Sequence, residues 1–144
     1  MNIEQMSAIY KMAKAIYNRE ERLVNGKEKL FLSHGINKNS FADCYRAFQK
    51  MLDGELHTRG ISTDLRDYYL SQIYKDYGAD KLRIALKAYM DFIIYYEEGH
   101  NNTTRKIERE IHQKYCNVLS ESNASRTIEN EINAYWEGEL GQVT

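Results

Sequence analysis

The chain contains no proline and only two cysteines among its 144 residues. Proline lacks an amide hydrogen and its ring clashes with the preceding helical turn, so its absence favours long uninterrupted helices. Two cysteines are too few for a disulfide framework. Cys44 and Cys116 both fall at apolar helical positions, and we therefore interpret them as reduced thiols inside a core.

Long hydrophobic runs and targeting segments are also lacking. The longest apolar run, residues 92–96, is far shorter than the ~20 residues that a membrane-spanning helix needs. Near the N-terminus, Lys11, Lys14, Arg19 and Glu20 interrupt every apolar stretch, which argues against a secretory signal. We therefore expect a cytoplasmic protein without a membrane partner.

The chain also lacks a strong net charge. Twenty Lys and Arg oppose 21 Asp and Glu, for a net charge of −1. Residues 1–60 carry ten basic and seven acidic side chains, residues 61–120 carry nine of each, and residues 121–144 carry one basic and five acidic. A protein whose whole surface binds nucleic acid is usually more basic. A basic face confined to the first half of the chain remains open.

Helical periodicity runs through nearly the whole chain, because apolar residues recur at three- and four-residue spacings. The predicted helices cover about 3–24, 41–53, 64–77, 80–98, 104–120 and 125–137. The length fits one domain. We therefore predict an all-α fold: a compact single-domain bundle of about six helices over residues 1–144, with a frayed tail at 138–144.

Short polar motifs predict where the first helices end and begin. Asn25-Gly26 predicts the end of the first helix, since glycine readily adopts a left-handed conformation. The apolar residues 30–32 that follow are predicted as one helical turn or a strand. Ser40 with Asp43 resembles a capping box that begins the second helix, and Gly54 ends that helix.

The predicted helix 80–98 is apolar around most of its circumference. Only Arg83, Lys87 and Asp91 interrupt it, as one thin polar stripe. A helix of this kind is buried on several sides, so we predict it as the central helix of the bundle. The 104–120 helix has a narrower apolar face, made of Ile107, Ile111, Tyr115 and Leu119.

No catalytic or metal-binding motif is recognisable. The four histidines are scattered, and no two share the four-residue spacing that places a pair on one helical face. They read as ordinary surface residues, at positions 34, 57, 100 and 112. We predict a protein that is not an enzyme and that uses neither a metal nor another cofactor. An enzyme of unfamiliar type using Cys116 or a histidine is the remaining alternative.

Tyrosine is unusually frequent, with 12 tyrosines against four phenylalanines and one tryptophan. Each tyrosine hydroxyl must be solvated or form a hydrogen bond within the protein, so several tyrosines should reach the surface. Adjacent helical residues point about 100° apart, so the pairs Tyr68-Tyr69 and Tyr95-Tyr96 should rarely both be fully buried. Exposed tyrosines serve protein interfaces or stack on bases. Tyrosines at core boundaries are the simpler explanation.

A basic edge is predicted around residues 53–62, where Gly54 and Gly60 bracket a short polar run. Grouped basic side chains there would suit phosphates or an acidic protein surface. A set of solvated charges is the alternative. The candidate partner-binding residues, here called the predicted basic edge, are Lys38, Arg46, Lys50, His57, Arg59, Arg66 and Tyr68.

Several short motifs resemble the helical module that precedes the nuclease domain in some bacterial HNH-type restriction endonucleases. They are HGINKNS at 34–40, RGIS at 59–62, YYL at 68–70, DYG at 76–78 and YYEE at 95–98. The resemblance covers roughly residues 34–115 and implies a place in the conflict between bacteria and mobile DNA. It does not imply nuclease activity, because no HNH domain accompanies the module.

These observations lead to two functional hypotheses. The first is a non-enzymatic binding protein of phage or mobile-element origin that inhibits or adapts a bacterial CRISPR or restriction complex through protein contacts. The alternative is a DNA-binding accessory module related to restriction endonucleases, although the acidic residues 121–144 would repel phosphate. The oligomeric state stays open, including self-association through the helix that contains Trp136.

Overall fold

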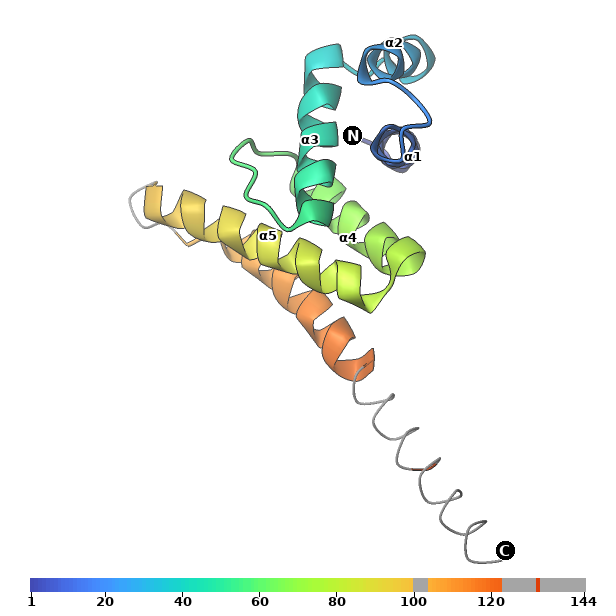
Figure 1. Ribbon diagram of the computed structural model, residues 1–144. Helices are drawn as coiled ribbons and strands as arrows, with labels where there is room; N and C mark the ends of the chain where they lie inside the picture. Colours follow the sequence, from blue (N-terminus) through green and yellow to red (C-terminus); the bar gives the residue numbers. More distant parts are fainter. Residues whose placement is uncertain (100–103, 123–131, 133–144) are drawn as a thin grey trace, which may run out of the picture.

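The computed structural model describes residues 1–99, 104–122 and 132, and it is helical wherever those residues form regular structure. No strand occurs in these parts of the chain, so the all-α prediction is confirmed (Figure 1). The elements are α1 (Ile3–Tyr17), α2 (Leu23–His34), α3 (Lys38–Asp53), α4 (Thr63–Tyr77), α5 (Ala79–Gly99) and a helix over 106–122. The predicted helix 125–137 and tail 138–144 lie outside the described residues, apart from residue 132.

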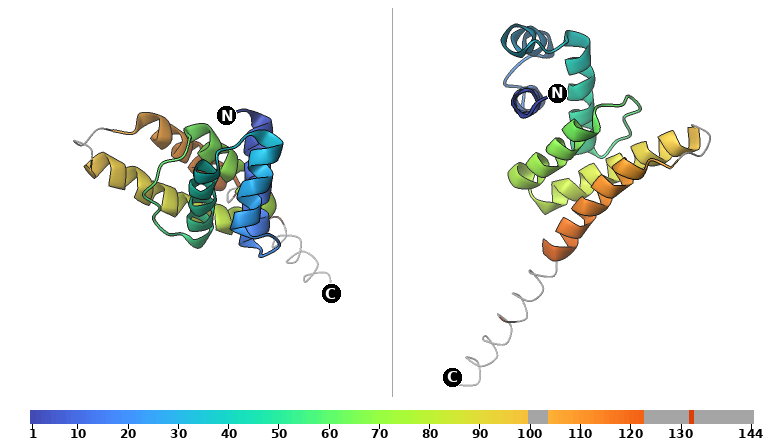
Figure 2. Two further views of the ribbon diagram at one scale, coloured as in Figure 1. Left: turned by 90° about the horizontal axis from the view of Figure 1, so that it is seen from above. Right: turned by 180° about the vertical axis from the view of Figure 1, so that it is seen from behind.

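The helices form two groups that α3 joins. α1, α2 and α3 pack on one another at one end of the molecule, and α3 and α4 both pack on α5 (Figures 1 and 2). The 106–122 helix runs back along α5, so these two form a helical hairpin. The segment 54–62 between α3 and α4 extends as a loop above the last turns of α5.

The single helix predicted over 3–24 is wrong, because two helices cover this stretch. α1 ends at Tyr17, and Arg19 takes a left-handed conformation with φ 62° before α2 begins. Gly26, predicted as a stop, lies buried inside α2. A Cβ atom there would lie only 3.0 Å from Ile16 Cδ1, so Gly26 permits close contact between α1 and α2. Residues 30–32, predicted as a turn or a strand, belong to α2.

The caps of α3 and α4 were predicted with mixed success. Asn37, not Ser40, caps α3: its side-chain oxygen accepts hydrogen bonds from the backbone amides of Asn39 and Ser40, both at 3.0 Å. The predicted capping box at Ser40 is therefore wrong. Gly54 ends α3 with φ 71°, as predicted. Ser62 caps α4 through its hydroxyl.

An aromatic cluster joins α1, α3 and α4 in the core. Phe48 is fully buried, and its ring centroid lies 5.6 Å from Tyr10, 6.0 Å from Tyr17 and 5.4 Å from Tyr69. The Tyr69 hydroxyl donates to the Cys44 carbonyl oxygen at 2.8 Å. Cys44 is a buried free thiol, as predicted. Part of the tyrosine excess therefore fills the core, where the Tyr69 hydroxyl finds a backbone partner.

α5 is the central helix, as predicted, but one side of it is open to solvent. Its buried residues face α3, α4 and the 106–122 helix; they are Leu82, Ala85, Leu86, Ala88, Tyr89, Phe92 and Ile93. Ile84, Ile94 and Tyr95 are exposed. The exposed side is therefore wider than the thin polar stripe that the sequence indicates.

Candidate functional site

The structure disperses part of the predicted basic edge along α3. Lys38 lies at the first turn of α3, where its ammonium is 2.5 Å from Glu28. Lys50 lies at the other end of α3, with its ammonium 2.5 Å from Glu55. Each cation has an acidic partner, so neither contributes a bare positive charge to a shared patch.

Of the predicted edge, Arg66 is buried and Tyr68 is only partly exposed. Arg66 is 1% exposed, so its prediction as a surface cation is wrong. Tyr68 is half-buried, with its ring centroid 6.1 Å from that of Tyr10. The buried Tyr69 beside the half-buried Tyr68 confirms that adjacent helical tyrosines do not both go fully inside.

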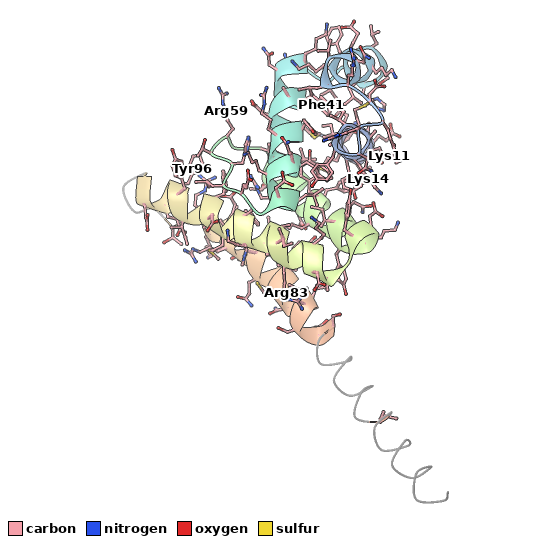
Figure 3. The ribbon with its side chains drawn as sticks, in the orientation of Figure 1. Lys11, Lys14, Phe41, Arg59, Arg83 and Tyr96 are labelled. Carbon is pink, nitrogen blue, oxygen red and sulfur yellow. The ribbon has the colours of Figure 1, made fainter. Side chains whose placement is uncertain are left out.

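Three members of the predicted edge do come together around Asp43. The Arg46 guanidinium lies 3.8 Å from one carboxylate oxygen of Asp43, and Arg59 lies 3.6 Å from the other. His57 is half-buried beside them, and its pKa is lowered by burial and by the charge of Arg66. Two guanidinium groups share one carboxylate, and the Arg59 side chain is 74% exposed. Arg59 projects away from the ribbon (Figure 3).

Arg66 organises the interior below this loop. Its guanidinium carbon lies 4.8 Å from the ring centroid of Tyr89 and 4.3 Å from that of Phe92, which are cation–π distances. Its Nε and Nη2 atoms have no hydrogen-bond partner within the described part of the chain. Burial lowers the pKa of the Arg66 guanidinium. Arg66 therefore acts as a packing element between α4 and α5.

A second arginine, Arg105, also contacts the Phe92 ring, together with the ring of Tyr96. The Arg105 guanidinium carbon lies 5.1 Å from the Tyr96 centroid and 6.0 Å from that of Phe92, and its Nε donates to Glu108 at 2.5 Å. Glu108 is 3% exposed, whereas Ile107 is 64% exposed. The prediction that Ile107 faces inward is therefore wrong, because the Arg105–Glu108 pair occupies the inner position at the start of this helix.

The loop is tied to the hairpin by Tyr96, whose hydroxyl donates to the backbone carbonyl of Thr58. Tyr95, its neighbour on α5, is 46% exposed. Arg59 and Tyr96 lie on the same side of the molecule (Figure 3). We call this region the loop–hairpin surface; its exposed or partly exposed members are Arg46, Arg59, Tyr95, Tyr96, Arg105, Lys106 and Ile107.

The hairpin is closed by a carboxylate on α5. Glu97 accepts hydrogen bonds from Arg109 Nε at 2.6 Å and from the Arg105 backbone amide at 2.8 Å. A shallow depression of about 300 Å³ opens beside this junction. It is lined by Thr63, Arg105, Lys106, Ile107 and Glu108.

Acid is expected to loosen this hairpin. The hydrogen bond from Arg109 lowers the pKa of Glu97 from an ordinary 4.5 to about 2. Because the pKa of Glu97 is lower in the folded state than in the unfolded state, the Glu97–Arg109 interaction stabilises the hairpin fully above about pH 4.5. This stabilisation is lost as the pH falls toward about 2. We expect the Arg109 Nε–H resonance to broaden over that interval in an NMR titration. Glu97→Gln should remove the transition, and an unchanged transition in that variant would contradict the assignment.

Catalytic and metal-binding groups are sparse among the residues described. No three His, Cys, Asp or Glu side chains approach closely enough there to hold a metal ion. His34 is exposed, whereas His57 and His112 are half-buried, so the surface interpretation is wrong for these two; His100 lies outside the described residues. Burial raises the pKa of the Cys116 thiol. The absence of enzymatic activity stays a prediction.

Among the described helices, none is both long enough and apolar enough to cross a membrane. Comparison with protein-family models, with curated proteins and with solved structures finds no match. The resemblance to the module of HNH-type restriction endonucleases therefore stays a prediction.

Proposed function

We propose that this chain is a non-enzymatic binding protein of phage or mobile-element origin. It inhibits or adapts a bacterial CRISPR or restriction complex by docking through the loop–hairpin surface. The observation that carries the proposal is a surface that displays arginine, tyrosine and isoleucine side chains beside a shallow depression. Arginine and tyrosine are enriched among the residues that dominate binding at protein interfaces.

The surface is held in place by contacts between elements that are distant in sequence. Tyr96 fixes the loop at Thr58, and Glu97 fixes Arg105 and Arg109 at the start of the 106–122 helix. A surface ordered before binding loses less conformational entropy when the partner docks. This order supports docking by Arg59 and its neighbours as a preformed patch.

The pairing of cations with acids favours a protein partner over DNA. DNA binding gains most of its affinity when cations neutralise phosphates and release counterions. Here most cations of the predicted edge and of the hairpin contact carboxylates already. The pairs are Lys38–Glu28, Lys50–Glu55, Arg46 and Arg59 with Asp43, and Arg105–Glu108.

Charge reversal at Arg59 tests the proposal. Bacteria that carry a CRISPR or restriction system would be challenged with phage while they express the chain. We expect expression to raise phage plating, and Arg59→Glu to reduce that protection on the order of 10-fold or more, since an exposed anchor then opposes its partner. Lys11→Glu is the matched control, because Lys11 is an exposed cation on the opposite side of the molecule (Figure 3).

Two outcomes would count against the proposal. If the Arg59→Glu and Lys11→Glu variants raise phage plating equally, the loop–hairpin surface does not take part in the interaction. If the unmodified chain does not raise phage plating on bacteria with either system, its proposed role against bacterial defence is refuted. A mobility shift of duplex DNA that weakens with salt and with Arg59→Ala or Lys50→Ala would favour the DNA-binding alternative.

A further inference from the structure

A histidine and a cysteine lie one helical turn apart on the 106–122 helix. His112 Nδ1 is 3.5 Å from Cys116 Sγ. The other ring nitrogen of His112, Nε2, lies 3.0 Å from the backbone carbonyl oxygen of Leu86 on α5. A carbonyl oxygen can only accept, so Nε2 carries the hydrogen and donates it. Nδ1 therefore presents its lone pair toward the cysteine sulfur.

The pair is accessible from solvent. His112 and Cys116 line an open depression of about 370 Å³ between α5 and the 106–122 helix, and Met90 lines the same depression. Both His112 and Cys116 are half-buried, as is Met90. The side chains of a histidine, a cysteine and a methionine thus line a single opening, whose remaining walls are Arg83, Leu86, Lys87, Asp91 and Leu119.

We propose that His112 Nδ1, Cys116 Sγ and Met90 Sδ form a binding site for a soft monovalent metal ion, Cu(I). A metal about 2.3 Å from a thiolate sulfur and about 2.0 Å from an imidazole nitrogen, at the roughly 120° angle of a three-ligand site, separates those two atoms by about 3.7 Å. His112 Nδ1 and Cys116 Sγ stand 3.5 Å apart, close to that separation. The pair can therefore bind the ion without a change of backbone.

The surroundings of His112 also suit a metal ligand. Histidines that bind metals usually donate their second ring hydrogen to a carbonyl or carboxylate, which fixes the tautomer and the ring orientation. The Leu86 carbonyl takes this role, and it belongs to the helix on which Met90 stands. The same hydrogen bond therefore holds the ring at a defined place relative to α5.

Cu(I) fits this donor set better than Zn²⁺. Structural zinc sites use four nitrogen, sulfur or carboxylate ligands, and no third His, Cys, Asp or Glu joins the pair within the described chain. Thiolate and thioether sulfur select Cu(I), which is stable with two or three ligands. Asp91 borders the depression but pairs with Lys87 at 3.3 Å.

Binding involves no change of oxidation state. The Cys116 thiol releases one proton, its sulfur forms the bond to copper, and the ion remains Cu(I), so the thiolate and the ion neutralise each other. The site shares no residue with the loop–hairpin surface. Its test is therefore independent of the proposed docking function.

Competition with a chromophoric chelator tests the site on the full chain. The purified protein would be titrated without oxygen into the Cu(I)–bicinchoninate complex, and loss of the chelate absorbance would be measured. We expect one Cu(I) per chain. Cys116→Ser and His112→Ala should each weaken binding on the order of 100-fold, and Met90→Leu about 10-fold, since it removes the thioether while keeping the volume.

Matched controls use the chain's other thiol and an exposed imidazole. Cys44→Ala and His34→Ala should leave the Cu(I) affinity unchanged, with thermal melts confirming that every variant is folded. Ag(I), which is redox-inert, should shift the NMR signals of the His112 ring and the Met90 methyl group. Failure to withdraw Cu(I) from the chelate, an equal loss in Cys44→Ala, or preferential binding of Zn²⁺ would overturn the proposal.

Discussion

Replacing Phe48 with alanine is expected to lower the free energy of unfolding by about 4 kcal/mol, because removal of the large aromatic side chain leaves a cavity in the core. Phe48 is fully buried on α3 and contacts the rings of Tyr10 and Tyr17 on α1 and of Tyr69 on α4. The variant therefore loses contacts that join three helices at once. Domains of this kind are stable by about 5–15 kcal/mol, so the variant should lose a large share of its free energy of unfolding.

Urea denaturation followed by circular dichroism measures this effect. Phe31→Ala on α2 is the matched control, because the same ring is removed from a side chain that is 48% exposed. We expect that control to cost less than about 1 kcal/mol. Equal losses in the two variants would show that the ring cluster around Phe48 does not organise the core.

Replacing Arg66 with alanine is expected to cost about 3 kcal/mol, chiefly through lost packing. Its guanidinium lies over the rings of Tyr89 and Phe92, and two of its nitrogens have no hydrogen-bond partner in the described part of the molecule. Arg66→Met fills a similar volume without unpaired donors. We expect it to stay within about 1 kcal/mol of the unmodified chain, because apolar replacement of a buried charge is often neutral.

Comparing the two Arg66 variants by urea denaturation separates packing from charge. If Arg66→Met is as unstable as Arg66→Ala, the positive charge near Glu108 and the aromatic rings holds this region together. If both variants keep full stability but no longer raise phage plating as the unmodified chain does, Arg66 takes part in binding despite its burial. Either result would change the role assigned here, in which Arg66 supports the loop–hairpin surface from below.

The apolar faces of the helices and the glycines that end two of them could be predicted from the sequence. Phe41, Cys44 and Phe48 recur at helical spacing, and all three are buried on α3. Gly54 and Gly78 end helices at positive φ, a conformation that glycine adopts without steric cost. These features depend on neighbours within one or two turns, which is why the all-α fold and the α5 helix were predictable.

Local signals failed where tertiary packing decided the outcome. Gly26 looked like a helix stop, yet its missing side chain admits α1, while Arg19 takes the left-handed turn. Ile107 matched the apolar spacing, but Glu108 takes the inner position because Arg105 lies beside it over the aromatic rings. In both cases the deciding contact comes from side-chain packing that spacing alone does not reveal.

The candidate sites divide in the same way. The sequence by itself identified Arg59 as a candidate partner-binding residue and indicated that Tyr95 and Tyr96 are not both fully buried. Only the tertiary structure decided that Arg66 is buried and that the His112–Cys116 pair, four residues apart on one helix, lies beside Leu86 and Met90 of α5. The periodicity of a helix is a property of adjacent turns, whereas burial, charge pairing and ligand geometry depend on side chains brought together from distant parts of the chain.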